Sequence, residues 1–359
     1  MPNNIFRWIQ DRKLIMALSR IDTTNMIEDV PQSKLDNNIN FRNIIINGDM
    51  SIAQRGTSTS SITSSGYYTA DRFRLGVDTA GTWTQSQSTD VPNSQGFQKS
   101  TKLDCTTANA SLGTGNILFF EQLFEGQNLQ YLKKGTANAE SLTASFWVKS
   151  NKTGTYIVEL IDDSNRHINK SYTINSANTW EKKTITYTGD TTGDAIDNDN
   201  TVGLTLNFWL VAGSNFTSGT LQTSWGSLTN SNRAVGQVNL ADSTSNEWYI
   251  TGVQLEAGDT ASDFEFLPRQ VTENLCFRYF YKNIGHGSIV ADTYINDISD
   301  DGVKRLFIQY PQIMRATPSL SGTGTASVAF QYQGNASAIA YMFTSSGALI
   351  NSYTLNSEL

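Results

Sequence analysis

The chain has 359 residues, only 16% of them are charged, and the formal net charge at pH 7 is -7. Nucleic acid is not expected as a partner, because binding to phosphate backbones requires a basic surface. Serine, threonine, asparagine and glycine dominate between short apolar runs, which favours many β-strands joined by polar turns over a helical enzyme. At about 150 residues per domain, the length allows two or three domains.

The start of the chain contains one candidate helix, over residues 3–21. The apolar residues at roughly helical spacing are Ile5, Trp8, Ile9, Ile15, Met16 and Leu18. They predict an amphipathic helix, and because no large core follows before residue 41, its apolar stripe is expected to bind sibling chains or a neighbouring protein. A frayed terminal tail is the alternative. We interpret residues 1–41 as an attachment segment.

Residues 42–267 form a series of predicted short strands. The stretch RNIIINGDMSIAQRG, residues 42–56, is expected to hold the first strand, which ends in the positive φ that an Asn-Gly turn allows. The runs LTASFWVKS and GLTLNFWL alternate apolar and polar residues with period two. Helical segments between the strands are missing, so we predict a two-sheet antiparallel sandwich and not parallel βαβ units.

The last part of the chain begins at a proline. Pro268 opens the run PRQVTENLCFRYFYK, whose spacing predicts a short linking helix over residues 268–282. Residues 283–359 again alternate in short strands, and we predict that they form a smaller C-terminal β domain. No repeat of fixed period occurs, which argues against a β-helix.

Several phrases of the sequence stand in the order found in a known family. RNIIINGDMSIAQRGTS, YYTADRFRL, NEWYITGVQLEAGDTASDFEF and LCFRYFYK resemble a module of bacteriophage tail-fibre and receptor-binding proteins. QIMRATPSL resembles a strand that usually follows, so the resemblance spans roughly residues 42–320. It implies a jelly-roll sandwich akin to carbohydrate-binding modules, carried on a virion appendage and usually trimeric. The fibre helices often contain CQRYY, whereas residues 276–280 are CFRYF, which predicts a more buried or subunit-covered helix.

Two tryptophans, Trp147 and Trp209, fall on the polar phase of their predicted strands. Aromatic faces stack on sugars, and tryptophan also fills interfaces between subunits. Three roles stay open for this pair: glycan stacking, a protomer interface, and packing in a second core face. Tyr310, Tyr332 and Tyr341 lie beside polar loops of the C-terminal domain and are candidate receptor contacts, although core packing is the expected role of at least two.

No metal ion or cofactor is expected. Modules of the resembling family often hold a structural calcium with their Asn-Gly-Asp-Phe-Glu opening and an Asp in the closing strand. This chain keeps Asp49, but Met-Ser follows it, and Thr251-Gly252 stands where the closing Asp would be. The loop DISDDG matches half of a calcium loop, yet Ile308 stands where the bidentate Glu is needed, so we interpret it as a solvated acidic loop.

Enzymatic activity and membrane insertion are not expected either. His167 and His286 are the only histidines, without a nucleophile elbow or a metal-binding histidine pair, and no carboxylate pair stands out among the 33 acids. Cys105 and Cys276 lack partner spacing and are predicted to be buried thiols. No run approaches 18 apolar residues, and the N-terminus does not match a signal peptide.

These features together predict a structural virion protein, a phage tail fibre on the virion's tail that binds a host surface glycan or protein receptor. We expect a homotrimer, since closed cyclic symmetry buries identical apolar stripes, with residues 1–41 docking on other tail or virion proteins. The alternative is a capsid or head decoration appendage. A polysaccharide depolymerase is the third hypothesis.

Overall fold

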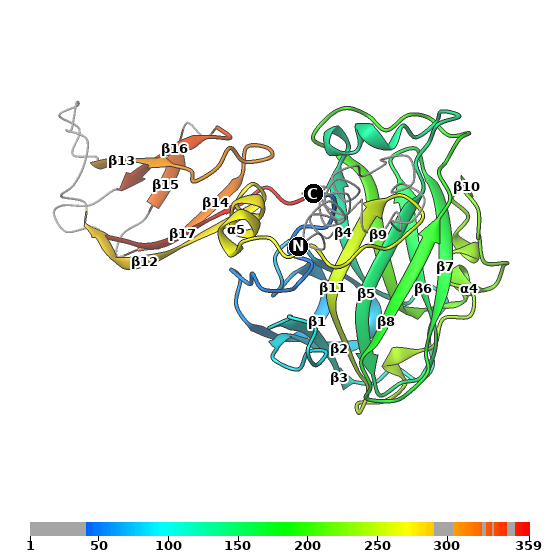
Figure 1. Ribbon diagram of the computed structural model, residues 1–359. Helices are drawn as coiled ribbons and strands as arrows, with labels where there is room; N and C mark the ends of the chain where they lie inside the picture. Colours follow the sequence, from blue (N-terminus) through cyan, green and yellow to red (C-terminus); the bar gives the residue numbers. More distant parts are fainter. Residues whose placement is uncertain (1–40, 291–303, 325–327, 332–333, 343–348) are drawn as a thin grey trace, which may run out of the picture. The chain divides into compact units, whose positions relative to one another are not determined.

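The computed structural model describes residues 41–290, 304–324, 328–331, 334–342 and 349–359 (Figure 1). The predicted attachment segment lies outside the described residues except for Phe41, and so do the DISDDG loop and Tyr332. Residues Arg42–Leu359 form one compact unit. Its secondary structure consists mainly of antiparallel β-strands.

Within the described residues, eleven strands form the large sheet. They are β1 (Ser58–Tyr67), β2 (Arg74–Ser88), β3 (Ser100–Thr107), β4 (Ile117–Glu125), β5 (Leu142–Ser150), β6 (Gly154–Asp162), β7 (Arg166–Ile174), β8 (Glu181–Tyr187), β9 (Val202–Ala212), β10 (Gly226–Ser227) and β11 (Glu247–Ala257). The short helices between them are η2 (Gly126–Asn128), η3 (Gln130–Leu132), α4 (Ser214–Thr217), η4 (Asn230–Asn232) and η5 (Leu240–Asp242). The strand order is β10-β7-β6-β9-β4-β2-β3-β11-β5-β8, and β1 pairs with β2.

Strand β2 carries the chain from one layer of the sandwich to the other. Its first part, residues 74–78, pairs with β4, and its second part, residues 82–88, pairs with β3. Gly81 lies between the two parts with φ +85°, a backbone conformation that favours glycine. The sheet therefore folds into a first layer, β10-β7-β6-β9-β4, and a second layer, β3-β11-β5-β8 (Figure 1). The predicted all-β jelly-roll sandwich is confirmed.

Side chains at alternating positions of the two layers meet in the core. The ring of Phe146 on β5 lies 5.0 Å from the ring of Phe208 on β9, and Phe208 lies 6.3 Å from Trp248 on β11. Leu206 and Val148, at the same phase of β9 and β5, have no exposed surface. Burying a side chain of this size stabilises the fold by about 1.5–3 kcal/mol. The period-two alternation thus predicted the core-facing positions of both strands correctly.

The predicted first strand is wrong. Residues 44–46 belong to no β-strand, although the turn begins where predicted, with Asn47 at φ 63°. The side chain of Gln122 accepts a hydrogen bond from the Ile46 nitrogen (2.8 Å) and donates one to the Ile46 carbonyl (2.9 Å). Because a side-chain amide satisfies both backbone groups, this residue needs no partner strand.

After β11 the chain forms helix α5 (Arg269–Phe277) and two three-stranded sheets, β12-β17-β14 and β13-β16-β15. Their strands are β12 (Phe280–Val290), β13 (Lys304–Gln309), β14 (Ser319–Gly324), β15 (Val328–Gln331), β16 (Ser337–Met342) and β17 (Leu349–Asn356). The helix is shorter than the predicted range 268–282. It ends at Phe277 because the chain enters β12 at Phe280, where it pairs with Asn356 of β17.

Paired charges join α5 and the last residues of the chain to the sandwich. Glu125, fully buried at the end of β4, accepts hydrogen bonds from Arg278 (2.7 and 2.6 Å) and from the hydroxyl of Tyr279 (2.5 Å). Burial opposes ionisation of Glu125, but these donors lower its pKa. Arg72, 1% exposed, pairs with Glu358 and lies 3.4 Å from the centre of the Tyr279 ring.

Candidate binding site on the second layer

Trp147 and Trp209 both point away from the core, but their surroundings differ. Trp209 has no exposed surface, and its ring lies 5.4 Å from the rings of Phe119 and Phe216. Phe216 belongs to residues 213–238, which we call the cover segment because Phe216, Leu221 and Arg233 within it pack on the outer side of the first layer. Trp147 is only partly buried and lines a pocket. Packing in a second core face therefore fits Trp209, and a binding role stays open for Trp147.

The pocket has a volume of about 380 Å³ and lies on the outer side of the second layer. Strands β5 and β8 and a bulge in β11 form its floor, and the loops over residues 89–99 and 258–268 form its walls. Its lining residues are Ser94, Gln95, Phe97, Ser145, Trp147, Lys182, Gly252, Asp263, Phe264 and Phe266. This volume falls within the range of small-ligand sites.

Three phenylalanines from the two loops form one wall of the pocket. The ring of Phe97 lies 5.0 Å from Phe264 and 5.1 Å from Phe266, and the latter two rings are 4.8 Å apart. Each such pair stabilises the packing by about 0.5–1.5 kcal/mol beyond the buried area. Phe266 remains 52% exposed. The three rings therefore hold the loops together and leave an apolar face open to a ligand.

Gly252 leaves room for the ring of Phe97 against β11. It lies in the irregular register of β11 between Thr251 and Gln254 and has φ +61°. A Cβ atom at this position would lie 2.5 Å from the ring of Phe97, so glycine is what lets this ring rest against the strand. The Thr251-Gly252 pair, which stands where the sequence lacks a calcium ligand, thus has a packing role.

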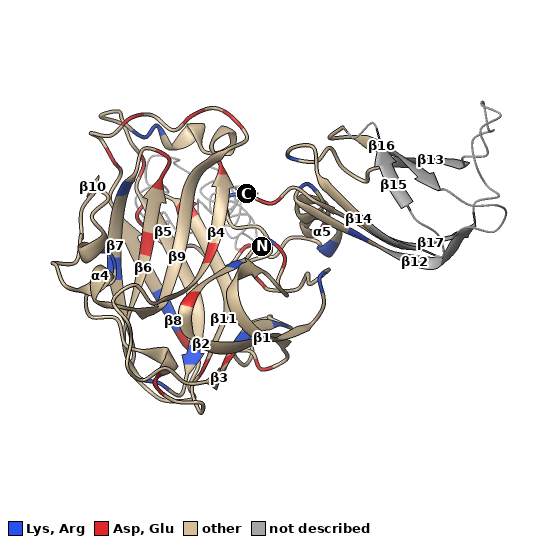
Figure 2. Cartoon of the chain, turned by 180° about the vertical axis from the view of Figure 1, so that it is seen from behind, with Lys and Arg blue, Asp and Glu red and all other residues tan. Residues whose placement is uncertain are grey.

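Polar groups of both kinds line the pocket beside the aromatic rings. Lys182 lies opposite Trp147 in the ladder between β8 and β5, and Asp263 belongs to the second loop. Among the described residues Lys182 forms no ion pair, whereas Lys102 and Lys149 on the same side of the layer pair with carboxylates. Acidic and basic residues are interspersed over the sandwich strands (Figure 2). One cation, one carboxylate and several neutral groups therefore offer hydrogen-bond donors and acceptors without a strong net charge.

The first loop is held at both ends, so the pocket exists before a ligand binds. Asp90 accepts hydrogen bonds from Lys149 and from the indole nitrogen of Trp180 (2.9 Å). Burial opposes ionisation of Asp90, but these two donors lower its pKa. At the other end, the hydroxyl of Thr251 donates to the carbonyl of Lys99 (2.7 Å). A preformed site avoids the entropy cost of ordering loops on binding.

The outer side of the first layer holds a buried charge network. Glu159 on β6 has no exposed surface and accepts hydrogen bonds from Arg233 (2.8 and 2.9 Å) and from the indole nitrogen of Trp209 (2.9 Å). His167 lies 3.1 Å from the same carboxylate. Burial opposes ionisation of Glu159, but Arg233, His167 and Trp209 lower its pKa. Since Arg233 belongs to the cover segment, this network fastens that segment to the layer.

A second carboxylate lies in the same row of the first layer. Glu121 on β4 and Glu159 on β6 both pair with Asn207 of the intervening strand β9. Two strand spacings separate them by about 10 Å, close to the separation in some glycosidases. Burial raises the pKa of Glu121, which pairs with Arg74. Both oxygens of Glu159 are occupied by protein donors, so the pair is not arranged to contact a substrate.

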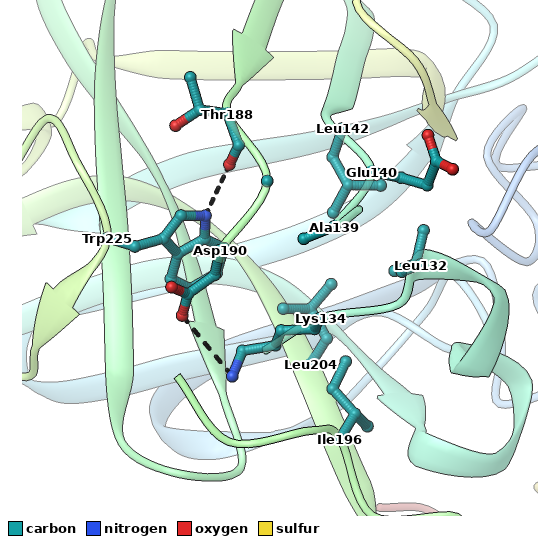
Figure 3. Close-up of a pocket in the computed structure, with 11 residues that line it drawn as sticks. Leu132, Lys134, Ala139, Glu140, Leu142, Thr188, Asp190, Ile196, Leu204 and Trp225 are labelled. Atoms are coloured by element: carbon teal, nitrogen blue, oxygen red, sulfur yellow. Dashed lines mark hydrogen bonds and ion pairs between the residues drawn. The ribbon is translucent and has the colours of Figure 1, made fainter. Parts of the chain in front are cut away.

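Another cavity lies near the start of β5 and is lined by Leu132, Lys134, Asp190 and Trp225, among others (Figure 3). Its volume of about 20 Å³ accommodates a single water molecule. The ammonium group of Lys134 lies 2.7 Å from Asp162 and 3.6 Å from Asp190. The indole nitrogen of Trp225 donates to the carbonyl of Thr188 (2.7 Å). These polar groups satisfy one another, so the cavity is less suited to a ligand than the Trp147 pocket.

Of the three candidate receptor tyrosines, only Tyr310 has a described side chain, and it does not line the Trp147 pocket. Tyr310 is 4% exposed, and burial raises its pKa to about 12, which fits a packing role. For Tyr341 the structure describes the backbone, which pairs with Arg305 of β13 and Ala329 of β15. Tyr332 lies outside the described residues.

The aromatic wall of the pocket was not predicted from the sequence. Phe97, Phe264 and Phe266 lie in polar loops without periodicity, and loops supply binding residues more often than a strand pattern reveals. The signal available was the presence of large aromatic residues, GFQ and DFEF, in otherwise polar connections.

Other sequence predictions can be compared with the described part of the chain. Cys105 and Cys276 are free and buried, as predicted. Among the described residues, no group of three His, Cys, Asp or Glu side chains could hold a metal ion. No helix in these ranges is long and apolar enough to cross a membrane.

Neither a protein-family model nor a curated protein sequence matches this chain. Several solved structures are similar to it in part. The enzymatically active domain of tailspike protein 4 from bacteriophage CBA120 is 14% identical, with a TM-score of 0.31 over 60% of this chain and 21% of that one. A structure titled CBM4 is 14% identical (TM-score 0.29, 59% of this chain, 97% of that one). A family 11 carbohydrate-binding module from Clostridium thermocellum is 10% identical (TM-score 0.28, 57% and 98%). At these values the likeness carries no argument about function, which depends on the pocket itself.

Proposed function

We propose that this chain binds carbohydrate in the Trp147 pocket, without catalysing a reaction on it. The observation that carries this proposal is the composition of the pocket: apolar aromatic faces on two sides, with a lysine, a carboxylate, serines and a glutamine between them. Sugars present both apolar ring faces and many hydroxyl groups, so they match such a mixture. The absence of a strong net charge at the pocket favours a neutral glycan.

The setting that we propose for this binding is a bacteriophage tail fibre that recognises the host surface. The order of the phrases that resemble tail-fibre modules supports it, and it includes a homotrimer and attachment through residues 1–41. Immunogold labelling of intact particles tests the setting: label on the tail is expected, whereas label on the head would favour a capsid appendage. Light scattering tests the trimer, and a stable monomer at micromolar concentration would contradict it.

The binding function is tested with a printed array of linear oligosaccharides and isothermal titration of the glycans that bind. Trp147→Ala is expected to weaken binding by about 10- to 100-fold, because a central aromatic contact is lost. The matched control is Tyr131→Ala, which removes a 48% exposed aromatic ring that does not line the pocket. Binding that survives in Trp147→Ala and fails in Tyr131→Ala would contradict the site. Release of reducing ends from a bound glycan would show turnover and revive the depolymerase hypothesis.

A further inference from the structure

Beside the pocket lies a second aromatic side chain that the pocket itself does not use. Glu181 of β8 pairs with Val148 of β5, and the antiparallel register continues to place Trp180 opposite Lys149. Trp180 therefore lies on the same side of the layer as Trp147, diagonally across two adjacent strands. Diagonal neighbours of this kind are about 7–8 Å apart. We call these two indoles, which share one outer face along β5 and β8, the aromatic path.

Trp180 is held in place before any ligand arrives. Its indole nitrogen donates to Asp90 (2.9 Å), its ring lies 6.1 Å from the ring of Tyr249, and the ammonium of Lys149 is 5.6 Å from the ring centre. A ring fixed on three sides costs little entropy when it receives a ligand. Trp180 is nevertheless only partly buried, so part of it stays accessible.

Trp180 directly precedes β8, the strand that carries Lys182 of the pocket. Within the described residues, strand β8 stands at the end of the strand order of the large sheet. Lys182 lines the pocket two positions from Trp180, and among the described residues it forms no ion pair. A ligand confined to the pocket would leave Trp180 uncovered, whereas a ligand that continued past Lys182 would reach it.

We propose that the ligand is a linear oligosaccharide chain, bound with one sugar in the pocket at Trp147 and a later sugar on Trp180. This inference rests on carbohydrate binding in the pocket, and it adds that affinity depends on chain length. Successive sugars would then lie along β5 and β8, between the phenylalanine wall at one end and Trp180 at the other. The pocket alone would suit a single terminal sugar. The ring of Trp180 would favour a longer oligosaccharide chain.

The experiment titrates the full chain with length series of neutral linear oligosaccharides, from one to six units, with both α- and β-linked series as probes. Affinity in wild type is expected to rise with length. Trp180→Ala and Trp180→Phe both lose the hydrogen bond to Asp90, so any weakening for the shortest probe is expected to be equal in the two variants. Trp180→Ala is expected in addition to remove the rise with length, about tenfold for the longest probe. Trp180→Phe keeps a ring and is expected to keep most of the rise, which separates stacking from a folding defect. Trp147→Ala is expected to weaken binding at every length.

The outcomes distinguish this inference from the function on which it rests. Binding that depends on Trp147 but not on length, or a Trp180→Ala loss that is equal for short and long probes, would overturn the extended chain and leave carbohydrate binding intact. No binding of any series by wild type would overturn both. Binding of a proline-rich peptide in place of every glycan would also overturn both and would assign the aromatic path to a protein partner.

Discussion

The two outer sides of the sandwich differ in what lies over them. Trp209 on the first layer and Trp147 on the second occupy the same phase of strands with similar sequences. The cover segment buries Trp209 completely, whereas no segment of the described residues closes the pocket at Trp147. Strand alternation therefore tells which side of a layer a residue faces, and a distant segment decides whether that side meets solvent.

The charges of the two sides differ in the same way. On the first layer, Glu159 has lost contact with water and is stabilised by Arg233 from the cover segment. On the second layer, Asp90 keeps 47% of its side chain exposed while it pairs with Lys149. A buried pair is costly to break, whereas an exposed pair contributes little. The first side is therefore built for stability, and the second can exchange contacts with a ligand.

The largest expected difference between the two sides comes from removing each tryptophan. Trp209→Ala should lower the free energy of unfolding by about 3–5 kcal/mol, since it opens a cavity beside Phe119 and Phe216 and takes a donor from Glu159. Trp147→Ala should lower it by less than about 1 kcal/mol, because partly exposed positions lose little packing. Urea unfolding of both variants measures the difference. Equal losses would mean that the two sides are not distinct.

A smaller effect is expected from the glycine under the pocket. Gly252→Ala should cost about 1–3 kcal/mol of folding free energy, because its Cβ would meet Phe97 and the positive φ is strained for alanine. Glycan affinity should fall as well, since Phe97 must move out of the wall. The control is Gly56→Ala, where φ is also positive (+129°) but no atom lies within 4 Å of the added Cβ. If only stability fell, Phe97 would not shape the site.

The sequence predicted the sandwich better than the site. Alternation in β5 and β9 predicted that Phe146 and Phe208 face the core, because the side a residue faces in a strand follows from its position in the local alternating pattern. The pocket instead requires Phe97 to meet Phe264 and Phe266, which are more than 160 residues away and lie in loops without period. No local sequence pattern predicts such a long-range contact between loops.

The packing of the cover segment on the first layer could not be predicted from the sequence for a related reason. Its contact with the first layer depends on Phe216 and Arg233, which stand among polar residues and follow no strand or helix spacing. The buried partner of Arg233 is Glu159, which occupies the solvent phase of β6 by alternation. A charged residue at an outward-facing strand position is expected to be exposed to solvent, and the sequence of β6 does not show that the cover segment buries it. For Trp209, packing in a second core face was one of three roles left open, and the sequence offered no way to choose it without the cover segment.

The smallest expected effect is the pH and salt dependence of Asp90 on the open side. The folded state lowers the pKa of Asp90, so its ionised form stabilises the fold above the unfolded pKa, and this contribution is lost as pH falls through the lower folded value. Asp90→Asn should therefore reduce stability at pH 7, by less than about 1 kcal/mol given its exposure, and the difference from wild type should vanish at pH 2. Urea unfolding at both pH values measures this difference in stability, and 1 M salt should shrink the difference at pH 7.

Glu159 on the first layer is the control for this prediction. Its pKa is also lowered, but the carboxylate is fully buried, so Glu159→Gln should change stability by an amount that salt hardly affects. If salt affected Glu159→Gln as much as Asp90→Asn, the cover segment would admit solvent and the two sides would be alike.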